Sequence, residues 1–292
     1  MFPENAGQMR ELLSRHGFRF SKSKGQNFLI TSLIPERMVA LTGTDAQTGV
    51  LEVGPGIGCL TRVLSRSADK VVAVEIDRSL EPILAETLTG LNNVELIFGD
   101  ILKTDIKELV SRAFNGLRPA VCANLPYNIT SPLLTKILES GLFEEITVMI
   151  QSETARRLCA APGTPEYGAF TVFVNWHAET EMLFDVSPEC FIPKPEVSGS
   201  VIRLLPRKSP PRAVVSEKMF FRTVRSAFGQ RRKTLRNALA AGFPECSKAD
   251  IELAIRSCGI APDARGETLG IPEFAELSDR MSDAAGSARG ET

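Results

Sequence analysis

The chain has 292 residues, of which 43% are hydrophobic and 24% are charged, and its formal net charge at pH 7 is −1. This length and composition are typical of a globular protein with room for one large and one small domain. They argue against a membrane protein, because no run of about eighteen apolar residues is present, and residues 1–13 lack the apolar segment of a signal peptide.

The numbers and positions of the cysteines and histidines indicate the cellular compartment and bear on whether the protein has a metal centre. The six cysteines are scattered without a Cys-x-x-Cys pair, and the two histidines, His16 and His177, lie far apart in the sequence. Scattered cysteines in apolar surroundings are typical of reduced core thiols, not of a disulfide framework or a zinc site. We therefore expect a cytoplasmic protein with no metal centre.

Short apolar runs alternate with helical patterns through the first two-thirds of the chain. The expected strands are Val50–Val53, Lys70–Glu75, Val94–Phe98, Ala120–Ala123 and Ile146–Gln151. The expected helices are Leu60–Ser67, Leu80–Leu88, Ile106–Phe114 and Pro132–Ser140. This alternation predicts an α/β fold with a doubly wound, Rossmann-like parallel sheet.

The remainder of the chain changes in character. Three runs are expected to add antiparallel strands at one edge of the sheet: Phe170–His177, Thr180–Phe184 and Ser200–Leu205. A proline-rich linker follows, and after it come only helical patterns, over Glu217–Phe228, Arg231–Ala241, Lys248–Ser257 and Pro272–Met281. We expect a first domain over residues 1–205, a small all-helical domain over 206–280, and a disordered tail over 281–292.

The first chemical signal is a glycine-rich segment, Leu51-Glu-Val-Gly-Pro-Gly-Ile-Gly58, between a strand and a helix. Gly54 and Gly56 allow a tight turn and close approach of a ligand. A tight turn without a ligand is the alternative, because such motifs are weak by themselves. A dinucleotide site needs a third glycine at the position of Cys59, whereas the spacing G-x-G-x-G is that of methyltransferases.

Acidic residues end the next two strands. Glu75 stands where a carboxylate can accept hydrogen bonds from both hydroxyls of a ribose. Asp100 stands where a carboxylate can accept from the exocyclic amine of an adenine, and a helix N-cap is an equally good interpretation of Asp100. Together these residues predict a nucleoside-containing cofactor.

The segment Asn124-Leu125-Pro126-Tyr127 ends the fourth strand and indicates the reaction. An aromatic amine is a poor nucleophile, because its lone pair is delocalised into the ring. The Asn124 side-chain oxygen and a backbone carbonyl at Leu125 or Pro126 can bind its two N–H groups in a preorganised turn. Tyr127 offers a face on which an extruded base can stack. A strand-end turn with a buried tyrosine is the alternative.

With these motifs, the chain resembles the ribosomal RNA adenine dimethyltransferases over nearly its whole length. Lys22-Ser-Lys-Gly-Gln-Asn-Phe-Leu29 is similar to the family's cofactor-lid motif, which implies that Asn27 and Leu29 contact the cofactor, S-adenosylmethionine. Phe191-Ile-Pro-Lys-Pro-Glu-Val197 resembles the family's F-x-P-x-P-x-V loop, which implies that Phe191 stacks on the target adenine. Without the resemblance, Phe191 would be interpreted as a core residue.

A third segment, Phe228–Leu239, resembles the signature of the small-subunit branch, the kasugamycin-sensitivity dimethyltransferases. That resemblance implies dimethylation of N6 on two adjacent adenosines near the 3′ end of 16S rRNA, by a class I methyltransferase that acts as a monomer during ribosome biogenesis. After Val197 the chain has Ser-Gly-Ser, where relatives often have an acid before the last serine, and we expect this departure to bear on the contacts of the loop and not on the chemistry.

Basic residues are concentrated between Arg203 and Arg236, where eleven lysines and arginines accompany one acid, Glu217, and leave a local charge of +10. Such a stretch favours an RNA-facing surface. The residues expected to bind RNA are Arg222, Arg225, Arg231, Arg232, Lys233 and Arg236. A solvated face, or pairing with an acid such as Glu217 or Asp250, is the alternative.

Three other functions compete with this interpretation. A macrolide-resistance methyltransferase would modify the large subunit instead of the small one. A non-catalytic nucleic-acid binder on the same fold would not need Asn124, Glu75 and the glycines. A nicotinamide dehydrogenase is disfavoured by Cys59 and has no use for the Asn124–Tyr127 segment.

Overall fold

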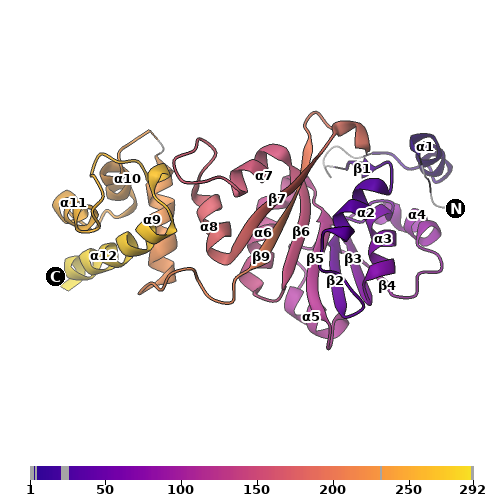
Figure 1. The fold of residues 1–292 in the computed structure, drawn as a ribbon, viewed down its shortest axis with the longest axis horizontal. Coiled ribbons are helices and arrows are strands. Elements are labelled where there is room, and N and C mark those ends of the chain that lie inside the picture. The colour runs from indigo at the N-terminus through magenta and orange to yellow at the C-terminus, as the bar shows by residue number, and fades with distance from the viewer. Residues whose placement is uncertain (1–2, 4, 21–25, 231, 291–292) are drawn as a thin grey trace. The chain divides into compact units, whose positions relative to one another are not determined.

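The computed structural model describes residues 3, 5–20, 26–230 and 232–290, and the chain forms two compact units (Figure 1). The first unit comprises Met1–Ala155 and Glu179–Pro206, and the second comprises Arg156–Ala178 and Arg207–Thr292. The chain therefore enters its second unit twice, whereas the sequence suggested one junction near residue 206.

The first unit is built on a seven-stranded sheet with the order β4-β3-β2-β5-β6-β9-β7. Its strands are β2 (Thr48–Val53), β3 (Lys70–Glu75), β4 (Val94–Phe98), β5 (Arg118–Asn124), β6 (Glu145–Gln151), β7 (Ala178–Val186) and β9 (Gly199–Pro206). The first five strands run parallel, and β9 pairs antiparallel with β6. The expected parallel sheet and the antiparallel addition at one edge are both confirmed.

Helices connect the parallel strands, as the alternating pattern predicted. They are α3 (Cys59–Ser67), α4 (Glu81–Thr87), α5 (Ile106–Ala113) and α6 (Thr130–Ser140), preceded in the chain by α1 (Ala6–Arg15) and α2 (Leu33–Ala40). The N-cap of α5 is Asp105, whose side chain accepts from the Glu108 backbone N–H at 3.0 Å. Val71, Val72 and Val74 of β3 are buried, as expected for a strand covered on both faces.

The order of the strands in the sheet indicates where a ligand binds. From β2 the chain continues to β3 and β4 on one side, and it then crosses to β5 and β6 on the other side. The order therefore reverses between β2 and β5, and ligands of such sheets bind at this point, beyond the carboxyl ends of the strands. Gly54 follows β2 directly and Asn124 ends β5, so both residues flank the crevice.

The expected strand Phe170–His177 is wrong, because these residues form the helix α8 (Ala169–His177). A short apolar run fits a strand or a buried helix equally well. Packing in the second unit favours the helix. Val172 and Trp176, which lie one helical turn apart, are both buried in the core of this unit, and the Trp176 ring stacks on Phe220 with the ring centroids 4.0 Å apart.

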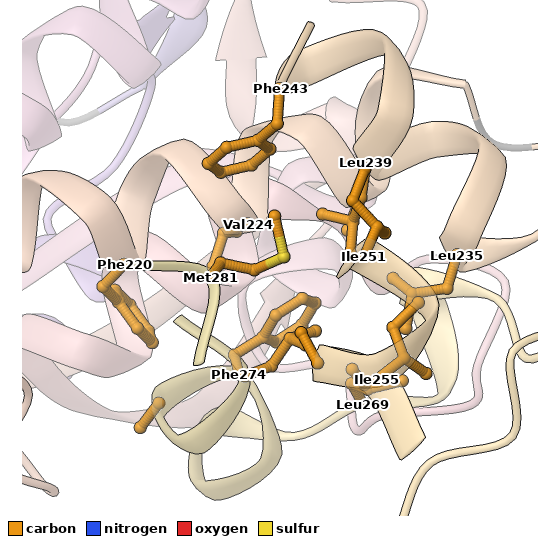
Figure 2. Packing of buried hydrophobic residues seen from close by; sticks show 14 of the residues in the cluster. Phe220, Val224, Leu235, Leu239, Phe243, Ile251, Ile255, Leu269, Phe274 and Met281 are labelled. Atoms are coloured by element: carbon orange, nitrogen blue, oxygen red, sulfur yellow. The ribbon is translucent and has the colours of Figure 1, made fainter. Parts of the chain in front are cut away.

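The second unit is helical, with a core of large apolar side chains. It contains α8, α9 (Glu217–Gly229), α10 (Leu235–Gly242), α11 (Lys248–Ser257) and α12 (Ile271–Gly290), and α7 (Ser152–Leu158) leads into it. Figure 2 shows three phenylalanines in one cluster, all fully buried: Phe220 of α9, Phe274 of α12, and Phe243, which directly follows α10.

Two boundaries differ from expectation. The helix expected over Arg231–Ala241 begins only at Leu235, and Arg231 itself lies outside the described residues. The expected disordered tail over 281–292 is wrong up to residue 290, because α12 continues to Gly290. Met281 and Ala285 point into the core of the second unit, so apolar contact stabilises this last stretch in spite of its small, polar composition.

Candidate active site

A cavity of about 220 Å³ lies at the carboxyl ends of β2, β3, β4 and β5. Four segments that follow these strands form its wall, together with a segment from the N-terminal part of the chain, Gln26–Leu29. Nearly every residue that the sequence analysis assigned to the cofactor or to the target base contributes to this wall, and all of it belongs to the first unit.

The glycine-rich turn has a backbone that only glycine adopts readily. Gly54, Gly56 and Gly58 have φ angles of 71°, 60° and 88°. A Cβ atom on Gly56 would lie 2.9 Å from Cδ1 of Phe28, and one on Gly54 would lie 3.6 Å from Cγ of Pro126. The turn therefore brings the glycine segment directly beside the Asn-Leu-Pro-Tyr segment.

Glu75 is buried at the end of β3 and lines the cavity. Its Oε1 accepts from the Asp77 backbone N–H at 2.8 Å, and its Oε2 accepts from the Gly56 N–H at 3.4 Å. Burial raises the pKa of Glu75, whereas these N–H groups favour its ionised form. The carboxylate joins the end of β3 to the glycine turn, and each oxygen keeps a lone pair for a ligand.

Asp100 also lines the cavity, in the loop that follows β4. Its Oδ1 accepts from the Leu102 N–H at 2.9 Å. Because Asp105 is the cap of α5, Asp100 is a turn residue and the N-cap interpretation is wrong. The loop is held from α6, where Lys136 Nζ donates to the backbone carbonyls of Leu102 and Thr104 at 2.7 and 2.6 Å and also to that of Ile101.

Asn124 and the residues after it form the opposite wall. Asn124 Nδ2 donates to the backbone carbonyl of Asn27 at 3.3 Å, which leaves Oδ1 for another donor. The Pro126 carbonyl already accepts from the Ile129 N–H and the Thr130 hydroxyl. Of the two candidate carbonyls, that of Leu125 is the one that accepts no hydrogen bond from the described residues.

Tyr127 lies beside these acceptors and lines the same cavity. Its hydroxyl oxygen is buried, and among the described residues it has no hydrogen-bond partner. Burial raises the pKa of Tyr127, so the phenol is neutral at physiological pH.

Phe191 differs from expectation. It is 2% exposed, it belongs to a core cluster of the first unit, and it is not among the residues that line the cavity. Its backbone forms β8 (Phe191–Ile192), which pairs antiparallel with β1 (Phe28–Leu29). In this geometry Phe191 packs in the core as the strand partner of Leu29, and its stacking on a target base stays a prediction.

Comparison with known proteins decides the family. The family model described as ribosomal RNA adenine dimethylase matches residues 17–282. The chain belongs to the ribosomal RNA adenine dimethylase family. It is 46% identical to ribosomal RNA small subunit methyltransferase A of Geobacillus thermodenitrificans, over 94% of this chain and 95% of that one. It is 43% identical to the protein of the same name from Listeria welshimeri, over 95% and 96% of the two chains.

Solved structures agree with this assignment. A dimethyladenosine transferase from Plasmodium falciparum superposes with a TM-score of 0.69 at 24% identity, over 86% of this chain and 95% of that one. The 23S rRNA methyltransferase ErmE superposes with a TM-score of 0.67 at 26% identity, over 88% and 100%. The predicted class I methyltransferase fold, the dependence on S-adenosylmethionine and the dimethyltransferase activity on ribosomal RNA are confirmed. Within the described residues, no helix has the length and apolarity needed to cross a membrane.

The residues of this dimethylase fit S-adenosylmethionine, and two of them escaped the sequence analysis. Ile76, directly after Glu75, lines the cavity with an apolar side chain and has 58% of its surface exposed. Glu52 is buried in β2, and its Oε2 has no hydrogen-bond partner among the described residues. A lone acid in the apolar run Val50–Val53 was the signal that could have identified it.

The burial of Glu52 has an electrostatic consequence. Desolvation raises the pKa of this carboxyl to about 8; a contact with Thr61 opposes the shift and the charge of Glu75 adds to it. An unpaired buried carboxyl of this kind suits a cation, and the cofactor of this dimethylase carries an ammonium and a sulfonium group. Because Glu52 lines the cavity, a cation bound beside it would favour the ionised form of this carboxyl.

The basic residues of the dimethylase fall into two groups. Arg222 pairs with Glu245 at 2.6 Å and lies over the Phe243 ring, and Arg236 pairs with Glu252 at 2.8 Å. The side chains of the second group are exposed and make no ion pair with a described residue: Arg225, Arg232 and Lys233. Arg222 and Arg236 thus pair with acids of their own unit, and RNA contact by the basic residues stays a prediction.

Proposed function

We propose that this protein transfers methyl groups from S-adenosylmethionine to N6 of two adjacent adenosines near the 3′ end of 16S rRNA, giving N6,N6-dimethyladenosine in the small ribosomal subunit. Support for the small subunit comes from the relatives named ribosomal RNA small subunit methyltransferase A, which are 43–46% identical over nearly the whole chain. The 23S rRNA methyltransferase ErmE shares only 26% identity.

The observation that carries the proposed chemistry is the orientation of Asn124. Its Nδ2 is occupied by the Asn27 carbonyl, so Oδ1 keeps its capacity to accept, as does the Leu125 carbonyl of the next residue. We assign these two oxygens to the two N–H groups of the target amine, where they draw the nitrogen toward tetrahedral geometry. Pro126 stiffens the turn, and Tyr127 provides the stacking face.

When bound, the cofactor would supply an electrophilic methyl group on its sulfonium, and Asn124 and the Leu125 carbonyl would position the N6 amine to receive it. The protein contributes positioning, since this reaction needs no metal. We assign Glu75 to the ribose hydroxyls, Asp100 to the adenine amine of the cofactor, and the backbone around Gly54 and Gly56 to its close approach.

Two further parts of the proposal concern the N-terminal segment and the partner. Asn27 and Leu29 line the cavity, where they would contact the cofactor. We assign contacts with the RNA backbone to three exposed cations, Arg225, Arg232 and Lys233. The same role is assigned to Arg231 from its position in the sequence. We also propose that the protein acts as a monomer, because one unit of one chain supplies all the described residues that line the cavity. We propose the cytoplasm as its location.

The test uses labelled S-adenosylmethionine with small and large ribosomal subunits that lack the modification, followed by mapping of the product by mass spectrometry. We expect two adjacent dimethyladenosines near the 3′ end of 16S rRNA. Label in 23S rRNA would instead support a large-subunit enzyme, the alternative that the likeness to ErmE favours. Tight binding without label would identify a non-catalytic assembly factor.

A further inference from the structure

A four-residue segment, Gln26–Leu29, which we call the strap, touches both sides of the cavity. Gln26 Nε2 donates to Asp77 Oδ2 at 2.6 Å. The next residue, Asn27, accepts at its backbone carbonyl from Asn124 Nδ2 at 3.3 Å. Two adjacent residues of the strap therefore join the loop after β3, beside the cofactor side of the cavity, to the end of β5, on the side of the target amine.

The Asn27 carbonyl determines which end of the Asn124 amide is available to a substrate. A carboxamide has a donating nitrogen and an accepting oxygen. A target amine with two N–H groups needs the oxygen, and a half-turn of the amide would present the nitrogen instead. Because a carbonyl only accepts, the Asn27 carbonyl selects Nδ2 and leaves Oδ1 free to face the amine.

The other end of the connection is a rigid anchor. Asp77 is 3% exposed, and its Oδ1 accepts from the Ser79 backbone N–H at 3.1 Å and from the Ser79 hydroxyl at 2.7 Å. Its own N–H donates to Glu75 Oε1 at 2.8 Å. Gln26 therefore holds a carboxylate that is itself fixed, through a short charge-assisted hydrogen bond.

We propose that Gln26 and Asp77 are positioning residues that act through Asn124: their hydrogen bond seats the strap so that the Asn27 carbonyl orients the Asn124 amide toward the target amine. The inference rests on the proposed methylation of an amine. It gives the N-terminal segment a role in activating the nucleophile, in addition to the cofactor contacts proposed for Asn27 and Leu29. It also links the Glu75 loop to the chemistry at Asn124 through a continuous chain of hydrogen bonds.

The substitution that tests the proposal is Gln26→Met, which keeps the length of the side chain and removes its donor. Phe28 and Leu29 keep their contacts with Gly56 and Phe191 in this variant, so the substitution releases only the Gln26–Asn27 end of the strap. At saturating cofactor and small subunits, we expect single-turnover methylation to slow by about 10-fold or more. The affinity for small subunits stays unchanged. Gln47→Met, at an exposed glutamine of the same unit, is the matched control and keeps the wild-type rate.

A double-mutant cycle separates positioning from general damage to the structure. If Gln26 acts through Asn124, Gln26→Met slows the wild-type enzyme but does not slow the Asn124→Ala enzyme further. Equal slowing in both backgrounds would show that Gln26 acts independently of Asn124 and would overturn the proposal.

A second readout needs no catalysis. The side-chain amide of Asn124 gives a ¹H–¹⁵N signal that is identified by its loss in Asn124→Ala. We expect this signal to shift in Gln26→Met and to stay in place in Gln47→Met. An unmoved signal in Gln26→Met would refute the positioning role even if Asn124→Ala has no measurable rate. Failure of the wild-type protein to methylate RNA would instead refute the proposed function, and the amide signal would still report on the strap.

Discussion

Glu75 Oε1 accepts a hydrogen bond from the Asp77 backbone N–H at 2.8 Å, within the loop that follows β3. The other carboxylate oxygen faces the Gly56 N–H at 3.4 Å. A carboxylate oxygen has room for more than one donor. Glu75 is therefore held in one orientation by the protein while it keeps acceptor capacity for the two hydroxyls of a ribose in the cavity.

Replacing Glu75 by alanine is expected to weaken cofactor binding more than methyl transfer. Each charged hydrogen bond that is lost should cost about 1.5–3 kcal/mol, so calorimetry with S-adenosylmethionine should show a decrease in affinity of at least about tenfold. Glu81→Ala, at an exposed glutamate in the first turn of α4, is the control and should bind normally. An affinity for Glu75→Ala equal to that of the wild type would remove this residue from the cofactor site.

Asn124→Ala should have the opposite effect. Loss of one preorganised polar group that acts on the reacting amine is expected to reduce the methylation rate by about 100-fold or more. Cofactor and subunit affinities should change much less, because other residues provide those contacts. Rapid-quench assays measure the rate, and Asn128→Ala, at an exposed neighbour that also lines the cavity, serves as the comparison. Near wild-type turnover in Asn124→Ala would exclude the proposed role.

The parallel sheet was predictable from the sequence because its strands form short apolar runs, of which β2 and β3 are buried and the edge strand β4 is half-buried. The apolar runs at β3 and β4 match the observed strands residue for residue, and flanking helical patterns mark them as parallel. The run at Phe170–His177 was not predictable, because period alone does not separate a short strand from a buried helix. Its helical state depends on contact with Phe220, more than forty residues later in the chain.

The candidate site was predictable for those functional residues that lie at the ends of the parallel strands. Gly54, Glu75, Asp100 and Asn124 each follow a strand, and the parallel sheet alone brings such residues together. Pairing between strands that are far apart in the sequence was not predictable. Phe191 is buried because β8 pairs with a strand at the start of the chain.

In the second unit, the contacts of Arg222 likewise depend on a residue that is distant in the sequence. From the sequence, both Arg222 and Arg225 were among the residues expected to bind RNA. Glu245, which binds Arg222, follows α10 and was not among the acids considered as partners. Charge counted along the sequence therefore overstated the number of arginines that are available to RNA.

Protonation of Glu52 should give the folded protein a specific dependence on pH. The pKa of Glu52 is raised by burial to about 8 in the folded state, against an ordinary value of 4.5. Between these values the folded state binds more protons than the unfolded state, so the free energy of unfolding falls as pH rises, by up to about 1.4 kcal/mol per pH unit. The stabilisation is fully present below pH 4.5 and is lost as pH rises through 8.

Glu52→Gln tests this dependence, because glutamine has a similar shape and does not titrate. Unfolding temperatures measured from pH 5 to pH 9 should fall less steeply for Glu52→Gln than for the wild type, since other groups titrate equally in both proteins. Parallel curves for the two proteins would show that Glu52 is ionised in the folded state across this range.

Arg222→Ala is expected to destabilise the second unit. The substitution removes two hydrogen bonds to Glu245, two to the Gly242 carbonyl, and the contact with the Phe243 ring. Because the pair is partly exposed, we expect a loss of about 1–2 kcal/mol in the free energy of unfolding, measured by thermal denaturation. Arg225→Ala, on the same helix, should change it by less than about 0.5 kcal/mol. Equal stability of the two variants would contradict the structural role of Arg222.

Arg225 and Lys233 are expected to dock the protein on the subunit without taking part in chemistry. Phosphate contacts act by release of counterions, so the affinity for small subunits should fall steeply with salt. Arg225→Ala and Lys233→Ala should each reduce the salt slope by about one, and cofactor binding should stay normal because the cavity lies in the other unit. Filter binding across a salt series measures the slope, and Arg236→Ala is the matched control, since Arg236 pairs with Glu252 and should leave the slope unchanged. If Arg225→Ala/Lys233→Ala keeps both the affinity and the slope of the wild type, these cations form a solvated surface and the RNA is bound elsewhere.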